Sequence, residues 1–188
     1  MNLTDYFLIA MPGIPDPIFG GTVVYMCEHN EFGALGIVIN KPLDAKLSDL
    51  LEKQNLTVSA DASDKVNVPV MFGGPVQGDR GFILHTTDAK FEASLNISDK
   101  IALTSSRDVL EAIAENRGPH HSLVAIGYAG WDAGQLENEI SRNSWLTVKA
   151  DSEMLFNMPI GERYDAAIKM LGFDPALLIT PNESTTLQ

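Results

Sequence analysis

The chain has 188 residues, of which 45% are hydrophobic and 20% charged, as in ordinary globular proteins, and this composition argues against disorder. With 25 acidic and 13 basic residues the net charge is −12, which repels the phosphate backbone and disfavours direct nucleic-acid binding. The single cysteine, Cys27, excludes an internal disulfide, and the N-terminus lacks a basic leader, so we expect a cytoplasmic protein. No apolar run approaches the roughly 20 residues that span a bilayer, and membrane insertion is therefore not expected.

The N-terminal segment predicts three strands and a long loop. Tyr6–Ala10 reads as the first strand, and residues 11–21, rich in proline and glycine, predict a loop held down by Ile14, Ile18 and Phe19. Residues 22–28 and 34–39 are rich in β-branched and other apolar residues. The polar segment between them predicts a β-hairpin.

The next segment predicts one helix and a strand pair. Leucines at positions 43, 47, 50 and 51 recur at helical spacing and predict a short amphipathic helix over residues 43–54. Residues 55–68 have no clear period and predict a variable surface connection. Residues 71–85 predict a strand, a sharp corner at Gly73, Gly74 and Pro75, and a second strand. That corner is a simple turn between strands, or it presents backbone N–H groups to an anion or a ligand.

The second half of the chain predicts strands and helices in alternation. Residues 93–97 and 101–104 predict short strands, and residues 105–118 a helix with a Ser105–Asp108 cap and a left-handed Gly118 at its end. The apolar run 123–128 predicts a buried strand that enters a glycine-rich turn and continues as a helix. Beyond it we expect a strand at Trp145–Lys149 and a last helix over residues 160–171. Residues 173–179 are predicted to pack on the body, and residues 181–188 to form a loose tail.

The junction between the strand at 123–128 and the following helix is the strongest local candidate for a site. Glycines before a helix N-terminus form a receptor for an anion or a carbonyl, and Asp132 with Gln135 predicts a capping box. The glycine spacing matches neither of the common nucleotide-binding motifs, so no nucleotide is implied. The alternative is architectural: Gly130 lets Trp131 pack over the sheet, and we favour packing for this tryptophan.

Cys27 and His29 suggest a different chemistry. In a strand these two side chains share a face, so the spacing permits a thiol nucleophile with a histidine base. A free cysteine is, however, among the most buried residue types and then inert, and buried filler is the favoured interpretation. His120 and His121 are adjacent in a loop and diverge, so they predict no metal site.

Four stretches together resemble a known family. They are FLIAMP at residues 7–12, VVYMCEHNEFGALGIVINKP at 23–42, FGGPVQGDRGFILH at 72–85 and GYAGWDAGQLENEISRNSWL at 127–146. In this order they are similar to the YqgE/AlgH family of largely uncharacterised bacterial proteins. The resemblance implies a single domain over residues 1–188 with an α+β fold, in which a mixed, bifurcated β-sheet curls into a pseudo-barrel with flanking helices. It implies no known reaction, and the AlgH name reflects a proposed regulatory role in alginate synthesis.

Three positions depart from the family pattern. Many relatives carry a basic residue where this chain has Gly20 and Gly21, a tryptophan in place of Tyr164, and a different C-terminal ending from residues 181–188. Roles assigned to those family positions do not transfer to this chain.

The main functional hypothesis is a non-enzymatic binding or regulatory module acting through its glycine-rich turns. The partner is an unknown protein or small molecule, and no cofactor, metal or catalytic set is expected. The binding candidates are Asn30, Asn40, Gly73, Gly74, Gly130, Trp131, Gln135 and Glu137. The alternative is a hydrolase or thiol-dependent enzyme that uses Cys27 and His29. If the first hypothesis holds, the two glycine-rich turns should lie on one side of the sheet.

Overall fold

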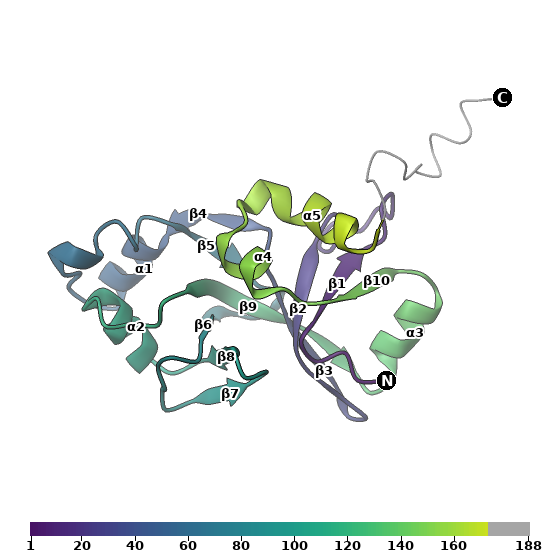
Figure 1. The fold of residues 1–188 in the computed structure, drawn as a ribbon, viewed down its shortest axis with the longest axis horizontal. Helices are drawn as coiled ribbons and strands as arrows, with labels where there is room; N and C mark the ends of the chain where they lie inside the picture. Colours follow the sequence, from purple (N-terminus) through teal and green to yellow (C-terminus); the bar gives the residue numbers. More distant parts are fainter. Residues whose placement is uncertain (173–188) are drawn as a thin grey trace. The chain divides into compact units, whose positions relative to one another are not determined.

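The structure, a computed structural model, describes residues 1–172 and divides into two compact units (Figure 1). Unit 1 combines Met1–Asn40 with the chain from Ala129 onward, and unit 2 is Lys41–Tyr128. The predicted packing of residues 173–179 and the predicted tail at 181–188 lie outside the described residues. A single domain over the whole chain stays a prediction.

Unit 1 is built on an antiparallel sheet with the strand order β10–β1–β2–β3–β9. Its strands are β1 (Tyr6–Ala10), β2 (Val23–Asn30), β3 (Gly33–Val38), the C-terminal part of β9 (Ser122–Asp132) and β10 (Trp145–Lys149). The predicted hairpin of β2 and β3 is present, and it carries a bulge at Cys27, because Met26 pairs with Gly36 while Glu28 pairs with Leu35.

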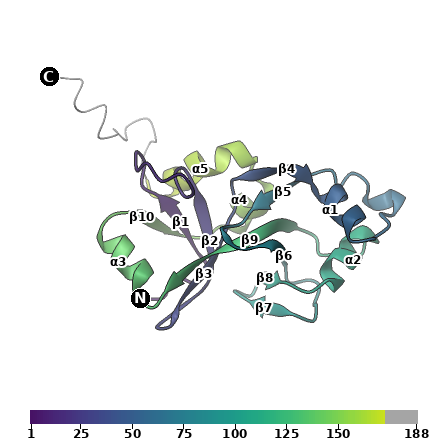
Figure 2. The ribbon, with the colours of Figure 1, turned by 180° about the vertical axis from the view of Figure 1, so that it is seen from behind.

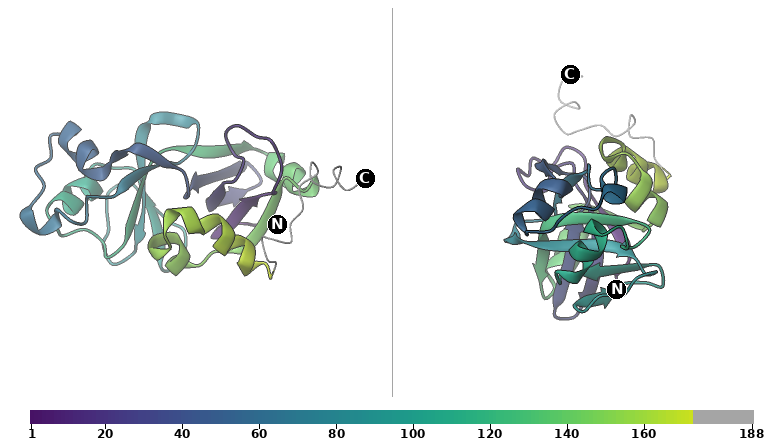
Figure 3. Two further views of the ribbon diagram at one scale, coloured as in Figure 1. Left: turned by 90° about the horizontal axis from the view of Figure 1, so that it is seen from above. Right: turned by 90° about the vertical axis from the view of Figure 1, so that its left-hand side faces the viewer.

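The helices of unit 1 are α3 (Gln135–Ser141), α4 (Ser152–Asn157), the 3-10 turn Ile160–Glu162 and α5 (Arg163–Met170). Helix α5 packs against β1 and β2 (Figure 3). Tyr164 donates its hydroxyl proton to the carbonyl of Ala10 at 2.6 Å, and the buried Arg163 donates to the carbonyls of Ile39 and Met158. Burial lowers the pKa of this guanidinium, and the two carbonyls supply partners that a buried cation requires.

Unit 2 contains the remaining strands around the N-terminal part of β9. They are β4 (Pro42–Lys46), β5 (Pro69–Phe72), β6 (Val76–Thr86), β7 (Ser94–Asn96) and β8 (Ile101–Thr104). β9 pairs antiparallel with β6, followed by β8 and β7, and it pairs parallel with β5, which continues to β4. The sheet is therefore mixed, and it branches at β9.

Two helices, α1 (Leu47–Lys53) and α2 (Asp108–Ala114), pack on one apolar cluster of unit 2 (Figure 2). A 3-10 turn at Ala60–Ala62 lies in the connection after α1. Its Ala62 and the following Val66 are buried, so the connection predicted to be a variable surface segment contributes to the core. The cluster gives unit 2 a hydrophobic core of its own. Unit 1 has a separate core, which contains Leu8, Val24 and Met26.

The Gly73–Gly74–Pro75 corner joins β5 and β6 as predicted. A Cβ at Gly73 would clash with the carbonyl oxygen of Gly127, and a Cβ at Gly127, whose φ is +76°, would clash with the carbonyl oxygen of Gly74. Two backbone segments thus approach each other more closely than any side chain permits, which explains these glycines by packing.

Several predictions of local structure are wrong. Leu43 lies in β4, so the helix begins at Leu47 and not at residue 43. β9 runs through Gly130 to Asp132, because Gly130 pairs with Leu35, so the glycine-rich turn starts only after the strand. Asn116, with φ of +58°, and not Gly118, is the left-handed residue after α2. Of the three predicted loop anchors, Ile14 and Ile18 are exposed and only Phe19 packs on the core.

The predicted α+β class, with a mixed, bifurcated and curled sheet flanked by helices, is confirmed. Among residues 1–172, no helix has the length and apolar character needed to cross a membrane.

Candidate functional site

The best-defined cavity among the candidate binding residues lies in unit 1, and we call it the tryptophan pocket. It has a volume of about 300 Å³ and is bounded by the loop between β1 and β2, by β9, by α3 and by the start of β10. The lining residues are Ala10, Ile14, Asp16, Phe19, Gly20, Gly130, Trp131, Gln135, Glu139, Ser144 and Trp145. All of them belong to unit 1.

Three aromatic rings form one wall of the tryptophan pocket. The ring centroids of Trp131 and Trp145 are 6.1 Å apart, and the ring of Phe19 lies 6.4 Å from the first and 5.8 Å from the second. Trp145 meets both other rings nearly edge to face, the geometry that aromatic quadrupoles favour. Both indoles are 6% exposed, so the wall is rigid and offers only part of its surface to an occupant.

The carboxylate of Glu139 holds the two tryptophans together. Its Oε1 accepts the indole N–H of Trp131 at 3.0 Å and that of Trp145 at 2.9 Å. Its Oε2 accepts a hydrogen bond from Nε2 of Gln135 at 2.9 Å, one helical turn earlier. All three donors are neutral, so they orient the carboxylate without compensating its charge.

The loop between β1 and β2 closes the pocket and is itself well organised. Oδ1 of Asp16 accepts the backbone N–H groups of Ile18 and Phe19 at 2.8 and 2.9 Å, which places the ring of Phe19 against the tryptophans. Asn40 ties the end of the loop to the sheet, because its side chain accepts from the amide of Val23 and donates to the carbonyl of Gly21. Asn40 therefore braces the pocket without lining it.

The charge of the tryptophan pocket is negative. Asp16 and Glu139 line it, and none of the lining residues is a lysine, arginine or histidine. An aromatic wall beside uncompensated carboxylates attracts cations that carry an apolar body.

The predicted binding residues are only partly brought together. Gly130, Trp131 and Gln135 line the tryptophan pocket, whereas Asn30 accepts the amide of Phe32 at the tip of the hairpin. Gly73 and Gly74 belong to unit 2, so the shared surface of the two glycine-rich turns stays a prediction. The predicted capping box is half present: the side chain of Gln135 accepts the amide of Asp132, but Gly134 is the residue that precedes α3.

Glu137 contacts His29 and does not line the pocket. Nδ1 of His29 accepts the amide of Leu3 at 3.0 Å, so Nε2 carries the proton and donates it to Glu137. The backbone amide of Glu137 itself, followed by the hydrogen bond from the His29 ring, lowers the pKa of the Glu137 carboxyl. The amide of His29 in turn donates to the Thr4 hydroxyl at 3.1 Å, so this histidine fastens the N-terminal segment to the sheet and to α3.

The arrangement does not support a Cys27–His29 nucleophile pair. Cys27 is 1% exposed, and burial, with a smaller contribution from Glu28, raises the pKa of its thiol well above its ordinary value. Its Sγ contacts the carbonyl of Tyr25, while both ring nitrogens of His29 are already bonded to other groups. Neither ring nitrogen of His29 is therefore left to act as a base for the Cys27 thiol.

A metal site is not formed within residues 1–172, where no three His, Cys, Asp or Glu side chains are grouped to hold an ion. The tryptophan pocket itself is lined by aromatic rings, two carboxylates and small polar groups.

Only Gly130, Trp131 and Gln135 of the lining residues were predicted as binding candidates, and the sequence reasoning missed the others, among them Asp16, Glu139, Ser144 and Trp145. One signal for Glu139 was present, since Gln135 and Glu139 have the i, i+4 spacing of side chains that bond on a helix surface. The signal for Trp145 was composition, because Trp131 and Trp145 are the two tryptophans of the chain.

Comparisons with known proteins agree on one family. The family model described as AlgH-like (DUF179) matches residues 7–176. A UPF0301 protein of Ralstonia nicotianae is 52% identical over 178 residues, which cover 95% of this chain and 93% of the relative. A UPF0301 protein of Dechloromonas aromatica is 52% identical over 172 residues, which cover 92% of this chain and 91% of that relative. The solution structure of the AlgH protein from Pseudomonas aeruginosa, 44% identical, superposes with a TM-score of 0.79 and covers 95% of this chain and 93% of that one. The predicted resemblance is thereby confirmed, and the chain belongs to the AlgH-like (DUF179, UPF0301) family.

Proposed function

We propose that this protein is a cytoplasmic binding module that recognises an organic cation with an apolar body in the tryptophan pocket. The observation that carries the proposal is the carboxylate of Glu139, which two indole N–H groups and one amide hold against an aromatic wall. The occupant carries a primary or quaternary ammonium group on an aromatic or aliphatic skeleton. A lysine side chain of a partner protein has the same chemistry.

Electrostatics and shape support a cation over an anion. Two carboxylates and no basic side chain line a cavity of about 300 Å³, which is at the small end of the range for ligand pockets. The net charge of −12 raises the local concentration of cations around the whole molecule. A cation over the exposed part of an indole gains a further contribution from the negative face of the ring.

Binding, and not catalysis, fits this pocket. Its lining contains no histidine or cysteine, and both of its carboxylates are engaged with hydrogen-bond donors that hold them in place. Rigid groups of this kind select a ligand by charge and shape. A regulatory role follows from binding if a ligand in the tryptophan pocket changes a surface that another protein binds.

Titration of the intrinsic fluorescence tests the proposal, because both tryptophans of the chain line the pocket. We expect phenethylammonium to change the emission in a saturable manner, and phenylacetate, its anionic counterpart, to have no effect. Glu139→Gln removes the charge while keeping the side-chain length, and it should weaken binding roughly tenfold or more.

Glu31→Gln is the matched control, because Glu31 is exposed in unit 1 and does not line the pocket. It should bind as the parent does. Equal affinity for the cation and the anion, or equal loss in both variants, would reject the tryptophan pocket as a cation site. The unfolding midpoint of each variant is measured alongside, so that loss of fold is not mistaken for loss of binding.

A further inference from the structure

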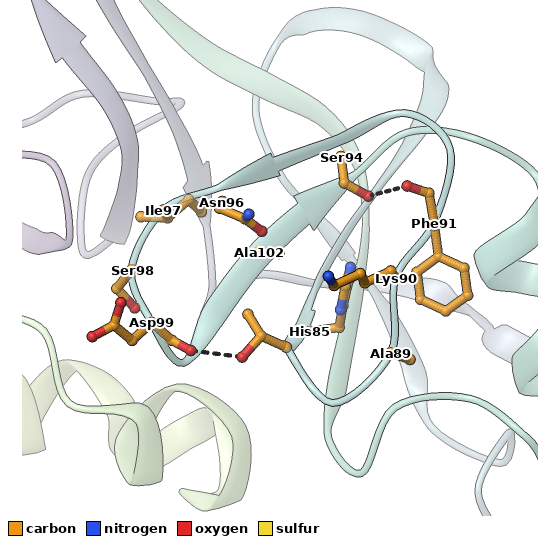
Figure 4. Close-up of a pocket in the computed structure, with 11 residues that line it drawn as sticks. His85, Ala89, Lys90, Phe91, Ser94, Asn96, Ile97, Ser98, Asp99 and Ala102 are labelled. Atoms are coloured by element: carbon orange, nitrogen blue, oxygen red, sulfur yellow. Dashed lines mark hydrogen bonds between the residues drawn. The ribbon is translucent and has the colours of Figure 1, made fainter.

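Unit 2 contains a second and larger cavity, of about 680 Å³, that the proposed binding function does not use. One of its walls is the sheet edge of β6, β8 and β7, and the other is formed by the connections on either side of β7 (Figure 4). Ser94, His85, Lys90 and Asp99 are among the lining residues (Figure 4).

Three side chains on neighbouring strands form a continuous hydrogen-bonded chain that ends in this cavity. Ser94 and Thr104 are a cross-strand pair of β7 and β8, and their hydroxyl oxygens are 2.6 Å apart. Oγ1 of Thr104 lies 2.6 Å from Nε2 of His85 on β6. His85 and Thr104 are 1% and 0% exposed, whereas Ser94 is exposed, so the chain connects an accessible hydroxyl to a buried imidazole.

The proton positions in this chain follow from the second ring nitrogen. Nδ1 of His85 lies 2.8 Å from the carbonyl oxygen of Thr86, which accepts and cannot donate, so Nδ1 carries the proton. In the neutral ring Nε2 is then an acceptor, and Thr104 donates to it. Burial lowers the pKa of His85, partly opposed by the Thr86 carbonyl and by Asp88, and the ring is therefore neutral at physiological pH.

The hydroxyl of Ser94 completes the chain. Its oxygen is 2.6 Å from Oγ1 of Thr104 and 3.0 Å from the carbonyl oxygen of Phe91, so its single proton has two acceptors within reach. When it donates to Thr104, every donor in the relay is directed toward Nε2 of His85. A buried neutral histidine thereby withdraws the proton of a serine that faces a cavity.

We propose that Ser94 is a nucleophile that accepts the acyl group of small carboxylic esters bound in the cavity of unit 2. In this step Oγ of Ser94 attacks the ester carbonyl while its proton moves to Thr104 and the Thr104 proton moves to Nε2 of His85. The ester C–O bond then breaks: Thr104 gives its hydroxyl proton to the alkoxide leaving group and takes the proton back from Nε2 of His85, so that an acyl-serine, an alcohol and a neutral imidazole result. Water reverses the sequence and releases the acid.

The lining of the cavity indicates which esters fit. The ammonium of Lys90 forms no hydrogen bond or ion pair within residues 1–172 and lies on the same cavity as Ser94, where it is available to the developing oxyanion or to an acidic group of the substrate. Phe91 and Ile97 supply apolar surface for the acyl chain. Ser94 is the catalytic residue, whereas Thr104 and His85 act through it as positioning residues that carry its proton.

A fluorophosphonate probe tests the reactivity of Ser94 without knowledge of the natural ester. Attack of Oγ on phosphorus expels fluoride and leaves a stable phosphonyl-serine, which intact-mass measurement and peptide mapping detect. We expect one adduct, on Ser94, and none in Ser94→Ala. Ser98→Ala is the matched control, because Ser98 lines the same cavity but contacts neither Thr104 nor His85, and it should be labelled like the parent.

The relay is tested separately at Thr104. Thr104→Ser keeps the hydroxyl and should retain labelling, whereas Thr104→Val has the same shape without a proton carrier and should slow labelling by about 100-fold. Labelling by the parent should also slow as the pH falls and His85 takes up a proton. No adduct on Ser94 in the folded parent, or equal labelling of the Thr104→Ser and Thr104→Val variants, would overturn the proposal, and circular dichroism of each variant confirms that it is folded.

Discussion

At the scale of single residues, Trp131 shows how one side chain serves both stability and a site. It is 6% exposed, belongs to the core cluster of unit 1 and donates its indole N–H to Glu139. Its remaining exposed surface lines the tryptophan pocket. Packing in the core and lining of the pocket are therefore not alternatives for this residue, although most of its surface is buried by packing.

Trp131→Ala should destabilise the protein strongly. The substitution leaves a large cavity beside Trp145 and Phe19 and removes one of the donors of Glu139, so we expect a loss of about 3–5 kcal/mol in the free energy of unfolding. Urea unfolding of the variant and the parent measures it. Phe32→Ala is the control, since that ring is 80% exposed and its removal should cost less than about 0.5 kcal/mol. An unchanged midpoint for Trp131→Ala would show that the ring is not a packing residue.

At the scale of secondary-structure elements, the attachment of the N-terminal segment to α3 is the most specific arrangement. His29 on β2 accepts the amide of Leu3 and donates to Glu137 on α3, and its own amide donates to Thr4. Leu3 is buried in the core cluster, so the residues before β1 are held by both apolar contact and hydrogen bonds. One imidazole thus connects three segments of unit 1.

His29→Ala should release the N-terminal segment locally. The amide of Leu3 loses its acceptor, and a buried amide without a partner costs about 1–3 kcal/mol, so its hydrogen exchange should accelerate roughly tenfold or more. Exchange at Leu3, measured by NMR, reports this opening directly. Glu137→Gln serves as the conservative comparison, because its side-chain oxygen still accepts from Nε2 and exchange should change little. Equal protection of Leu3 in His29→Ala would contradict the role of the histidine.

The elements also show what the sequence predicts well and where it fails. The strands β1, β8 and β10 have the predicted bounds, because each is a short apolar run between clear breaks. β9 was predicted too short because Gly130 looked like a turn, whereas in the sheet it is a strand residue paired with Leu35. Local propensity does not report pairing with a strand that is distant in sequence.

The candidate site was predictable only in part for the same reason. Gly130, Trp131 and Gln135 lie within one stretch and were found by their local pattern. Asp16 and Trp145 join them from separate segments, and no spacing in the sequence indicates that a loop after β1 and the start of β10 meet at α3. The serine relay in unit 2 is equally hidden, because its three residues come from three strands that only sheet register brings together.

At the scale of the whole molecule, each unit has its own hydrophobic core while β9 contributes residues to both. Both tryptophans belong to unit 1, and the buried His85 belongs to unit 2. Tryptophan emission therefore reports on unit 1, whereas far-UV circular dichroism follows the secondary structure of the described chain as a whole. The stability of unit 2 is accessible instead through its response to pH.

The protein should lose stability as the pH falls below about 6.5, because His85 is neutral in the folded state and freely protonated when unfolded. Burial lowers the pKa of His85 in the folded state. Between the folded and the unfolded pKa of His85 the unfolded chain therefore binds more protons than the folded one, and the free energy of unfolding rises with pH across that window. The contribution is complete above pH 6.5 and is lost progressively on acidification. The pKa values of Asp88, Asp108 and Glu137 are also lowered, from ordinary values of 3.8, 3.8 and 4.5, so these carboxylates act at more acidic pH than the window between pH 7.5 and 5.0.

Urea unfolding followed by circular dichroism at pH 7.5 and 5.0 measures this loss. In His85→Gln the difference between the two pH values should shrink, since glutamine does not titrate, even though the variant is less stable at both. His120→Gln removes an exposed histidine of the same unit and should leave the pH difference of the parent unchanged. If the parent were equally stable at both pH values, or if His85→Gln kept the full difference, the buried imidazole would not be the group that makes unit 2 sensitive to acid.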